Sequence, residues 1–255
     1  LFMANGTKYF IGNWKMFGIP SSYKIIDRVN RYFSNDKKNN RKYKVIFAPP
    51  FTLLQVFSKK YKKKKIDIAA QNCFQKDNFG AHTGNVSPFM LKKIGINYII
   101  LGHSENRALG ESDSILNHKV SIALKNNFNI IFCIGENERD KKNKKTLTVL
   151  KRQISKVFKK KYNFKKIIIA YEPIWSIGSG KVPSSDDLKK NIIFLKNFIK
   201  RKFRLSYRPK FLYGGSVDKN IIDIFKSINE LDGFLVGGAS KSSKNFIDII
   251  KNFYK

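Results

Sequence analysis

Acidic side chains are scarce in this chain of 255 residues: 18 Asp and Glu stand against 51 Lys and Arg, a net charge of +33. Such a surplus favours non-specific adhesion to nucleic acid or anionic membranes. The lysines, however, are spread through nearly every predicted helix, and Asn, Ile, Phe and Tyr are abundant too. All five residue types have A/T-rich codons. Compositional drift therefore explains the whole pattern, and we expect no specific nucleic-acid partner.

Cysteine and long apolar runs are scarce as well. Cys73 and Cys133 stand in apolar strand contexts with no metal-ligand spacing, which indicates buried free thiols in a reducing compartment. No apolar stretch approaches the roughly 20 residues that span a bilayer. No signal-peptide apolar region follows Leu1, Phe2 and Met3, and we interpret Leu1 and Phe2 as a remnant before a native Met3. We expect a soluble, cytoplasmic protein with no membrane partner.

Eight short apolar runs alternate with amphipathic stretches along the chain. The runs predict strands and the stretches predict helices. The predicted strands are Tyr9–Gly12, Val45–Ala48, Ile66–Ala70, Tyr98–Leu101, Ile130–Ile134, Ile167–Tyr171, Lys210–Tyr213 and Gly233–Val236. The clearest predicted helices are Tyr23–Phe33, Leu116–Lys125, Leu147–Phe158, Leu188–Phe203, Ile221–Ile228 and Phe246–Phe253. This number of alternating units matches the size and rhythm of a (β/α)₈ barrel, an α/β fold.

A doubly wound open sheet is the main alternative fold. It requires a glycine-rich phosphate fingerprint after the first strand. Here the first strand is followed by Asn13-Trp14-Lys15-Met16, with no such glycine pattern. No linker-like composition interrupts the alternation. We therefore expect one (β/α)₈ barrel domain over residues 1–255.

The stretch from Ala170 to Lys181 is the most informative part of the chain. Glu172 directly follows a buried strand, and Pro173 then prevents the strand from continuing. An isolated Glu before a turn is usually a surface acid. The apolar, glycine-containing segment that follows instead predicts a mobile cover beside a catalytic base. The predicted lid comprises Pro173, Ile174, Trp175, Ser176, Ile177, Gly178, Ser179, Gly180 and Lys181.

Polar residues and glycines follow several other predicted strands. They are Asn13 and Lys15 after the first strand, His103 and Glu105 after the fourth, Gly214, Gly215 and Ser216 after the seventh, and Gly237 and Gly238 after the eighth. In a (β/α)₈ barrel these strand ends form one active-site mouth. Backbone amides of the glycine turns can approach an oxyanion closely, which predicts a phosphate site. His103 precedes a short helix whose N-terminus disfavours ring protonation, so a neutral imidazole can donate a proton.

These segments together resemble the triosephosphate isomerase family along nearly the whole chain. The segments that carry the resemblance are Gly12 to Met16, Gly80 to Gly84, Gly102 to Glu105, Cys133 to Glu136, Ala170 to Lys181, Tyr213 to Val217 and Asp232 to Ser240. They occur in the family's order. Two other interpretations remain open: a relic barrel that binds partners through its charge, and a different phosphate-binding barrel enzyme. A relic barrel does not explain why Asn13, Lys15, His103, Glu105 and Glu172 are all present. A different phosphate-binding enzyme does not explain why Pro173-Ile174-Trp175 follows Glu172.

The resemblance implies interconversion of dihydroxyacetone phosphate and glyceraldehyde 3-phosphate through an enediolate, with no metal or organic cofactor. It implies that Glu172 transfers the carbon-bound proton and that neutral His103 polarises the carbonyl, since a carboxylate base and a neutral imidazole are the family's established pair. Lys15 and Asn13 would stabilise negative charge, and Glu105 would orient Lys15. The residues implied to hold the phosphate are Gly178, Ser216, Gly237 and Gly238, while Tyr213 and Ser216 would contact the closed lid.

The family resemblance also implies a homodimer. The loop from Gly80 to Ser87 would insert into the partner subunit, where Thr83 would support catalytic side chains. Asn85 and Asn106 replace a usual Glu and Arg that pair across the interface in the family. Because both charges are missing, neither is left buried and unpaired, and we expect the dimer to persist.

Two further departures lie near the expected site. Phe17 stands where the family usually has Asn. Pro183 stands in the trailing hinge of the lid, where the family usually has a small residue. Proline fixes φ, so we expect it to stiffen lid closure.

Overall fold

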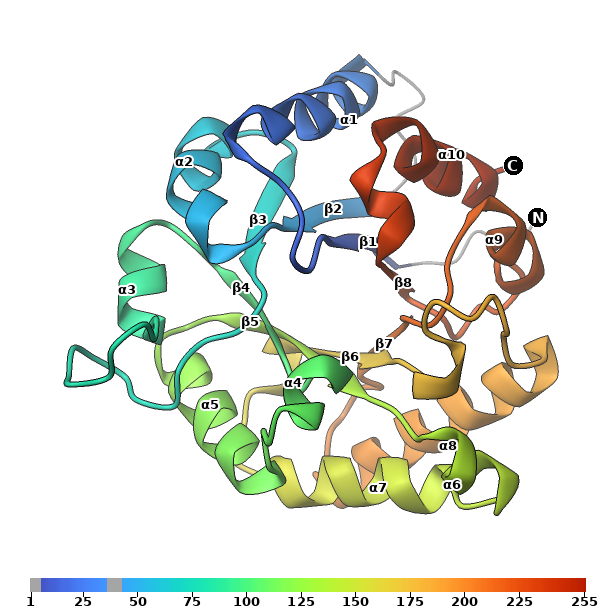
Figure 1. Ribbon diagram of the computed structural model, residues 1–255. Coiled ribbons are helices and arrows are strands. Elements are labelled where there is room, and N and C mark those ends of the chain that lie inside the picture. Colours follow the sequence, from blue (N-terminus) through green and yellow to red (C-terminus); the bar gives the residue numbers. More distant parts are fainter. Residues whose placement is uncertain (1–5, 36–42) are drawn as a thin grey trace.

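Eight parallel strands form a closed barrel in chain order, β1 to β8 (Figure 1). The protein is described by a computed structural model that covers residues 6–35 and 43–255, so the interpretation of Leu1 and Phe2 lies outside the described residues. The strands are β1 (Lys8–Asn13), β2 (Tyr43–Ala48), β3 (Ile66–Ala70), β4 (Tyr98–Leu101), β5 (Asn129–Ile134), β6 (Ile167–Tyr171), β7 (Lys210–Tyr213) and β8 (Gly233–Val236). The barrel closes where Tyr9 pairs with Gly233.

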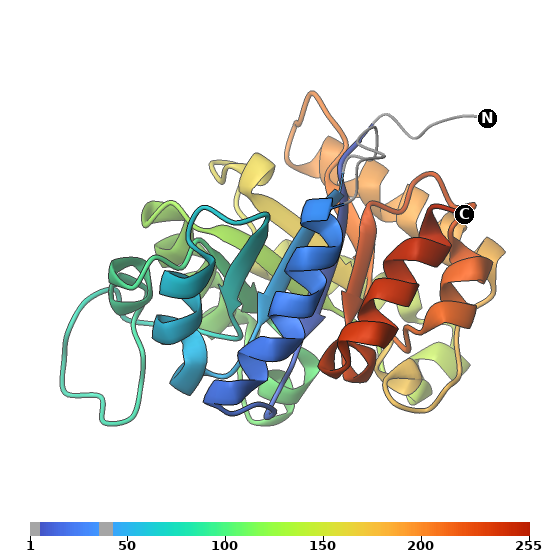
Figure 2. The ribbon, with the colours of Figure 1, turned by 90° about the horizontal axis from the view of Figure 1, so that it is seen from above.

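Helices surround the barrel on its outside (Figures 1 and 2). The α-helices are α1 (Tyr23–Asn35), α2 (Phe51–Tyr61), α3 (Pro88–Lys93), α4 (Ser104–Ala108), α5 (Asp113–Lys125), α6 (Glu138–Lys142), α7 (Thr146–Val157), α8 (Ser185–Lys202), α9 (Lys219–Phe225) and α10 (Ser243–Phe253). Short 3₁₀ helices are η1 (Pro20–Ser22), η2 (Phe164–Lys166), η3 (Ile174–Ser176) and η4 (Gly238–Lys241). The predicted (β/α)₈ barrel is confirmed. No helix of the described chain combines the length and apolarity that a membrane span requires.

Alternating side chains of each strand supply two apolar cores. On β1, Tyr9 and Ile11 belong to the core inside the barrel, whereas Phe10 belongs to the core between strands and helices. This follows from the two-residue period of a strand. Both faces of every strand are therefore covered, which explains the near-continuous apolar runs in the sequence.

The predicted strands match the structure to within two residues at each end. Three helices were missed: α2, α3 and α6. The last two have six and five residues, too few for a helical period to be visible. Four predicted helix ends differ by three residues: α9 ends at Phe225 and not at Ile228, and α5, α8 and α10 begin three residues before the predicted Leu116, Leu188 and Phe246.

The connection from β3 to α3 extends away from the barrel in both views (Figures 1 and 2). Residues 78–85 of this connection are all exposed, including Phe79 at 75% and the predicted dimer residue Thr83.

The two cysteines are buried free thiols, as predicted: Cys73 lies at the start of the connection from β3 to α3, and Cys133 lies on β5. Burial raises the pKa of Cys73 to about 12 and that of Cys133 well above its ordinary value.

Candidate active site

A cavity of about 580 Å³ opens at the carboxyl ends of the strands. The predicted site residues that line it are Asn13, Lys15, His103, Glu172, Gly178, Ser216, Gly237 and Gly238. They come from strands or loops spread around the barrel, so closure of the sheet is what brings them together. Glu105 and Thr83 do not line this cavity. Glu105 instead contacts Lys15, and Thr83 lies on the exposed loop after β3.

Glu172 follows the last residue of β6 and is only 3% exposed. Its backbone N–H donates to the carbonyl of Ile134 at 2.8 Å, which fixes the turn after the strand. Its Oε1 lies 3.5 Å from Nε2 of His103, while Oε2 has no hydrogen-bond partner among the described residues. Burial raises the pKa of Glu172 above its ordinary value, although the charges of His103 and Lys15 act against this rise. A carboxylate held in this way is a stronger base than one in water.

Two glycines, Gly135 and Gly214, leave the space that Glu172 occupies. A Cβ added at Gly214 would lie 2.7 Å from Cγ of Glu172, and one at Gly135 would lie 1.9 Å from its carbonyl oxygen. Real Cβ atoms do not approach so closely, because the electron shells overlap. The glycines of the Cys133–Glu136 and Tyr213–Val217 motifs therefore serve the placement of the base.

His103 caps the N-terminus of α4. Its Nδ1 accepts the backbone N–H of Glu105 at 3.3 Å. A neutral ring that accepts at Nδ1 carries its proton at Nε2, which is the nitrogen that points to Glu172 and the cavity. The short helix predicted after His103 is present and sets this orientation. Nε2–H is thus placed to donate to an oxygen of a bound molecule.

Lys15 is held in place by three segments. Its Nζ lies 2.7 Å from Oε1 of Glu105, and its backbone N–H donates to Oδ1 of Asn13 at 3.1 Å. The Lys15 backbone has φ 54°, a conformation that L-residues rarely adopt, and its carbonyl accepts from Nε2 of Gln71 at 2.8 Å. Burial acts to raise the pKa of Glu105, but the hydrogen bond from Lys15 and the charges of His103, Lys15 and Lys241 together outweigh it, and the pKa lies below the ordinary value. Sequence reasoning missed Gln71, because nothing in the sequence relates it to Lys15.

The leading hinge of the lid is attached to Glu136. Nε1 of Trp175 donates to Oε1 of Glu136 at 2.9 Å, and the Tyr171 hydroxyl donates to the same oxygen at 3.1 Å. The ammonium of Lys141 lies 3.2 Å from the centre of the Trp175 ring. Burial raises the pKa of Glu136. The motif Cys133–Glu136 thus supplies a hydrogen-bond acceptor for the lid, a role that its sequence alone did not indicate.

The middle of the lid is attached to the loop after β7. The hydroxyls of Ser176 and Tyr213 lie 2.9 Å apart, and Oγ of Ser216 donates to the Ser176 carbonyl at 2.5 Å. The Gly180 N–H donates to Oγ of Ser216 at 3.3 Å. A Cβ at Gly215 would lie 2.3 Å from the Tyr213 hydroxyl oxygen, so only glycine fits this contact. These bonds join lid residues to Tyr213 and Ser216, the two residues expected to meet the lid.

Lys241 and Asn245 line the cavity beside the glycine turn of Gly237 and Gly238. A Cβ on either glycine would meet no atom within 4 Å, so their backbone borders open space. The ammonium of Lys241 lies 5.2 Å from the centre of the Phe17 ring, and its charge helps to lower the pKa of Glu105. Sequence reasoning missed Lys241 because it is one lysine among many. Its place directly after the Asp232–Ser240 motif was the available signal.

No cluster of three or more His, Cys, Asp or Glu side chains with the arrangement of a metal site occurs among residues 6–35 and 43–255. The polar groups that line the cavity are backbone amides, two lysines, two asparagines, a serine and a histidine beside the carboxylates of Glu172 and Asp218. Such a set suits a small anion with an oxygen that accepts hydrogen bonds.

The family model described as triosephosphate isomerase matches residues 8–253. The chain belongs to the triosephosphate isomerase family. A triosephosphate isomerase of Mycoplasma mobile is 39% identical over 247 residues, which cover 96% of this chain and 99% of that protein. One from Thermodesulfovibrio yellowstonii is 36% identical over 247 residues, with 96% and 98% covered.

A solved structure agrees with this assignment. The crystal structure of triosephosphate isomerase from Bartonella henselae superposes with a TM-score of 0.87 at 31% identity, covering 97% of this chain and 99% of that one. As a member of the triosephosphate isomerase family, the protein is an isomerase of triose phosphates and serves glycolysis and gluconeogenesis.

Proposed function

We propose that Glu172 is the base that interconverts dihydroxyacetone phosphate and glyceraldehyde 3-phosphate. It removes a proton from the carbon beside the carbonyl; the C–H electron pair forms the double bond of an enediolate, and the carbonyl π pair moves to oxygen. Glu172 then returns the proton to the neighbouring carbon, which completes the isomerisation. The observation that carries this proposal is a buried carboxylate, 3.5 Å from an imidazole nitrogen, in a cavity that suits a phosphate.

His103 and Lys15 stabilise the charge that develops on oxygen. Nε2–H of neutral His103 donates to the carbonyl and moves protons between the two oxygens of the enediolate. Lys15 supplies positive charge, Asn13 holds its backbone, and Glu105 holds its ammonium at 2.7 Å. Groups that are already oriented before the reaction cost no reorganisation when the negative charge appears.

The phosphate is held by amides of Gly178, Ser216, Gly237 and Gly238, with Lys241 as a further cation. These residues line one cavity. Lid residues 173–181 exclude water from the enediolate, which would otherwise eliminate its phosphate. No metal or organic cofactor takes part in these steps.

A homodimer is the assembly we propose. Phe79 at 75%, Leu109 at 86% and Met16 at 99% are large apolar side chains that solvent reaches in the single chain. All three stand in connections that follow strands, on the carboxyl side of the barrel, and large exposed apolar groups on one side are typical of an interaction surface. Thr83 lies in the same exposed loop as Phe79 and is proposed to support the catalytic lysine and histidine of the partner subunit. Sedimentation at several protein concentrations tests this; a monomer at micromolar concentration with full activity would contradict it.

We further propose that residues 1–255 act as one barrel domain in the cytoplasm. The barrel uses strands from Lys8 to Val236 in a single closed sheet, so no part of it can be removed without opening the barrel.

A coupled assay of triose phosphate interconversion tests the proposed base. The intact chain should be active, and Glu172→Gln should lose about three orders of magnitude or more in kcat, because an amide cannot accept the proton. Asp186→Asn, an exposed carboxylate at the start of α8, is the matched control and should keep full activity. A folded, dimeric Glu172→Gln variant that keeps its activity would exclude Glu172 as the base. Inactivity of the intact folded chain would favour the charge-driven relic barrel.

A further inference from the structure

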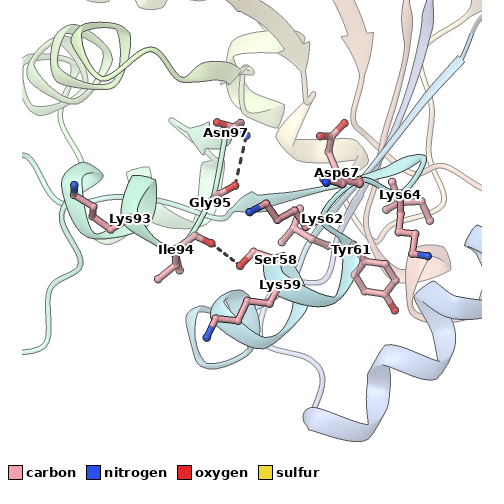
Figure 3. A pocket seen from close by; sticks show the side chains of 13 residues that line it. Ser58, Lys59, Tyr61, Lys62, Lys64, Asp67, Lys93, Ile94, Gly95 and Asn97 are labelled. Carbon is pink, nitrogen blue, oxygen red and sulfur yellow. Dashed lines mark hydrogen bonds between the residues drawn. The ribbon is translucent and has the colours of Figure 1, made fainter.

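A second cavity, of about 420 Å³, lies at the amino ends of β3 and β4, opposite the carboxyl ends that border the active site. Figure 3 shows the residues that line it. Its walls are the end of α2, the start of β3 and the connection between them, together with the end of α3 and the connection from α3 to β4. Oγ of Ser58, in the last turns of α2, donates to the Ile94 carbonyl at 2.6 Å and joins α2 to the connection that follows α3 (Figure 3). The family's reaction takes place at the other ends of the strands, so the isomerase site does not account for this cavity.

Positive charge dominates the cavity. The lysines that line it are Lys59, Lys62, Lys63, Lys64 and Lys93. The one acidic side chain among the lining residues, Asp67, is paired with Lys44 at 3.0 Å. No side-chain hydrogen bond or ion pair joins the first four lysines to any residue within 6–35 and 43–255. The ammonium groups of Lys59, Lys64 and Lys93 extend from different sides of the rim (Figure 3), and an anion bound between these flexible side chains reduces the repulsion among them.

The segment from Tyr61 to Lys64, at the rim of the cavity, forms a hydrogen-bonded turn. The Lys64 N–H donates to the Tyr61 carbonyl at 3.0 Å, and Lys63 between them has φ 65°. The Tyr61 hydroxyl is bound in turn to Asp27 at 2.7 Å, so α1 holds the end of α2. Glycine adopts a positive φ without strain, whereas the Cβ of any other L-residue makes that conformation unfavourable. The rim therefore carries a lysine at a position where glycine is the more stable choice.

We propose that this cavity binds a small anion with several phosphate groups, such as an oligophosphate. Its volume lies in the range of small-ligand sites. Several ammonium groups match a ligand with several negative charges better than a single phosphate. Nucleic acid fits less well, because Tyr61 is the one aromatic residue in the lining and is 4% exposed, which leaves no ring face on which a base can stack.

Two single substitutions separate this site from the general charge of the molecule. Lys63→Gly removes one of the charges that line the cavity and relieves the backbone strain of a side chain at positive φ. Lys144→Gly is the matched control, since Lys144 is an exposed lysine with φ 56° that does not line the cavity. Both variants lose one charge, and neither should be less stable than the parent, since glycine relieves each backbone. Lys63→Arg keeps the charge and serves as the rescue variant.

The experiment is calorimetric titration of inorganic tripolyphosphate into the full-length chain at about 0.15 M ionic strength. Excess glycerol 3-phosphate, which has the phosphate but no carbonyl, keeps the active site filled. We expect one saturable site per chain, a Kd that rises about fivefold or more in Lys63→Gly, and changes below about twofold in Lys144→Gly and Lys63→Arg. The parent kcat/KM should be kept in Lys63→Gly, so failure here is distinguishable from failure of the isomerase proposal.

Three results would overturn the proposal. One is the absence of saturable binding. Another is an equal loss of affinity in Lys63→Gly and Lys144→Gly, which would mean attraction to net charge alone. The third is a short single-stranded RNA that binds more tightly than tripolyphosphate with the same dependence on Lys63, which would make this surface a nucleic-acid site.

Discussion

The ionised form of Glu172 is unfavourable in the folded protein, because burial disfavours its charge more than the charge of His103, the Cys133 thiol and the charge of Lys15 favour it. The folded chain therefore holds this proton more tightly than the unfolded chain does. Stability from this group is present below the ordinary pKa of 4.5 and falls as pH rises through the higher folded value. The contribution of Glu105 to stability has the opposite pH dependence. Its pKa is lowered in the folded chain, so its contribution is lost as pH falls.

A pH series of thermal unfolding checks these signs. Glu172→Gln should raise Tm at neutral pH and flatten the fall of Tm above the ordinary pKa of glutamate. Glu105→Gln should lower Tm at neutral pH. Activity alone is less selective, since the substrate phosphate also ionises near pH 6. The acidic limb of kcat/KM should still have a midpoint above 4.5. An unchanged Tm profile in Glu172→Gln would show that its burial does not penalise the charge.

Lys241 gives a second prediction at the residue scale. It lines the active-site cavity, so Lys241→Met should raise KM about threefold to tenfold and change kcat less than about twofold, as expected for a partly exposed ion pair with the phosphate. Lys244→Met is the matched control, because Lys244 is exposed and does not line the cavity. Steady-state kinetics of both variants decide the point. Equal changes would mean that only net charge matters.

At the scale of elements, the predicted lid contacts the helix that follows β5. Lys141 of α6 places its ammonium over Trp175, and Glu136 accepts the indole N–H. A cation over an indole ring contributes about 0.5–2 kcal/mol. The leading hinge of the lid is thus docked through both contacts, while Gly178 and Gly180, with φ 69° and 73°, keep its tip free to bend.

Weakening that docking should impair control of the intermediate. Lys141→Met is expected to lower kcat about twofold to tenfold and to raise the fraction of turnovers that release inorganic phosphate. Lys142→Met, the next residue of α6, pairs with Glu138 and should have neither effect. Turnover and phosphate release measured on the same samples test this. Identical behaviour of the two variants would remove Lys141 from the hinge.

Pro183 lies in the trailing hinge of the predicted lid and is buried. If its fixed φ stiffens closure, Pro183→Ala should change kcat and phosphate release together. Unchanged values of both would count against that hypothesis. The substitution adds a backbone N–H at a buried position, so circular dichroism should first establish that the variant is folded.

At the scale of the whole molecule, the net charge of +33 acts on the rate at which substrate arrives. A triose phosphate is an anion, and a positive field that is focused in a cleft speeds its encounter with the site. We expect kcat/KM to fall as salt is raised and kcat to stay nearly constant. Stopped-flow or coupled assays over a salt series test this, with an uncharged osmolyte at matched viscosity as the control. A kcat/KM that does not fall would argue against steering.

The sequence alone determined the barrel and which strand ends bring the candidate site residues together, for a physical reason. Parallel strands all have their carboxyl ends on one side, so motifs that follow Gly12, Leu101 and Tyr171 must converge without any knowledge of distances. A buried strand also appears in the sequence as a run of apolar residues, and these runs located all eight strands to within two residues. The roles proposed for Glu172, His103 and Lys15 came from recognisable motifs at those ends.

Only the tertiary structure decided the contacts between segments far apart in the chain. Gln71 holds the Lys15 carbonyl across 56 positions, and Lys241 enters the active-site cavity beside Phe17. The lysine cavity at the opposite end depends on how two connections pack. In a chain with 51 basic residues, no local pattern separates these lysines from the rest. Their roles arise from distances in space, which neither composition nor periodicity encodes.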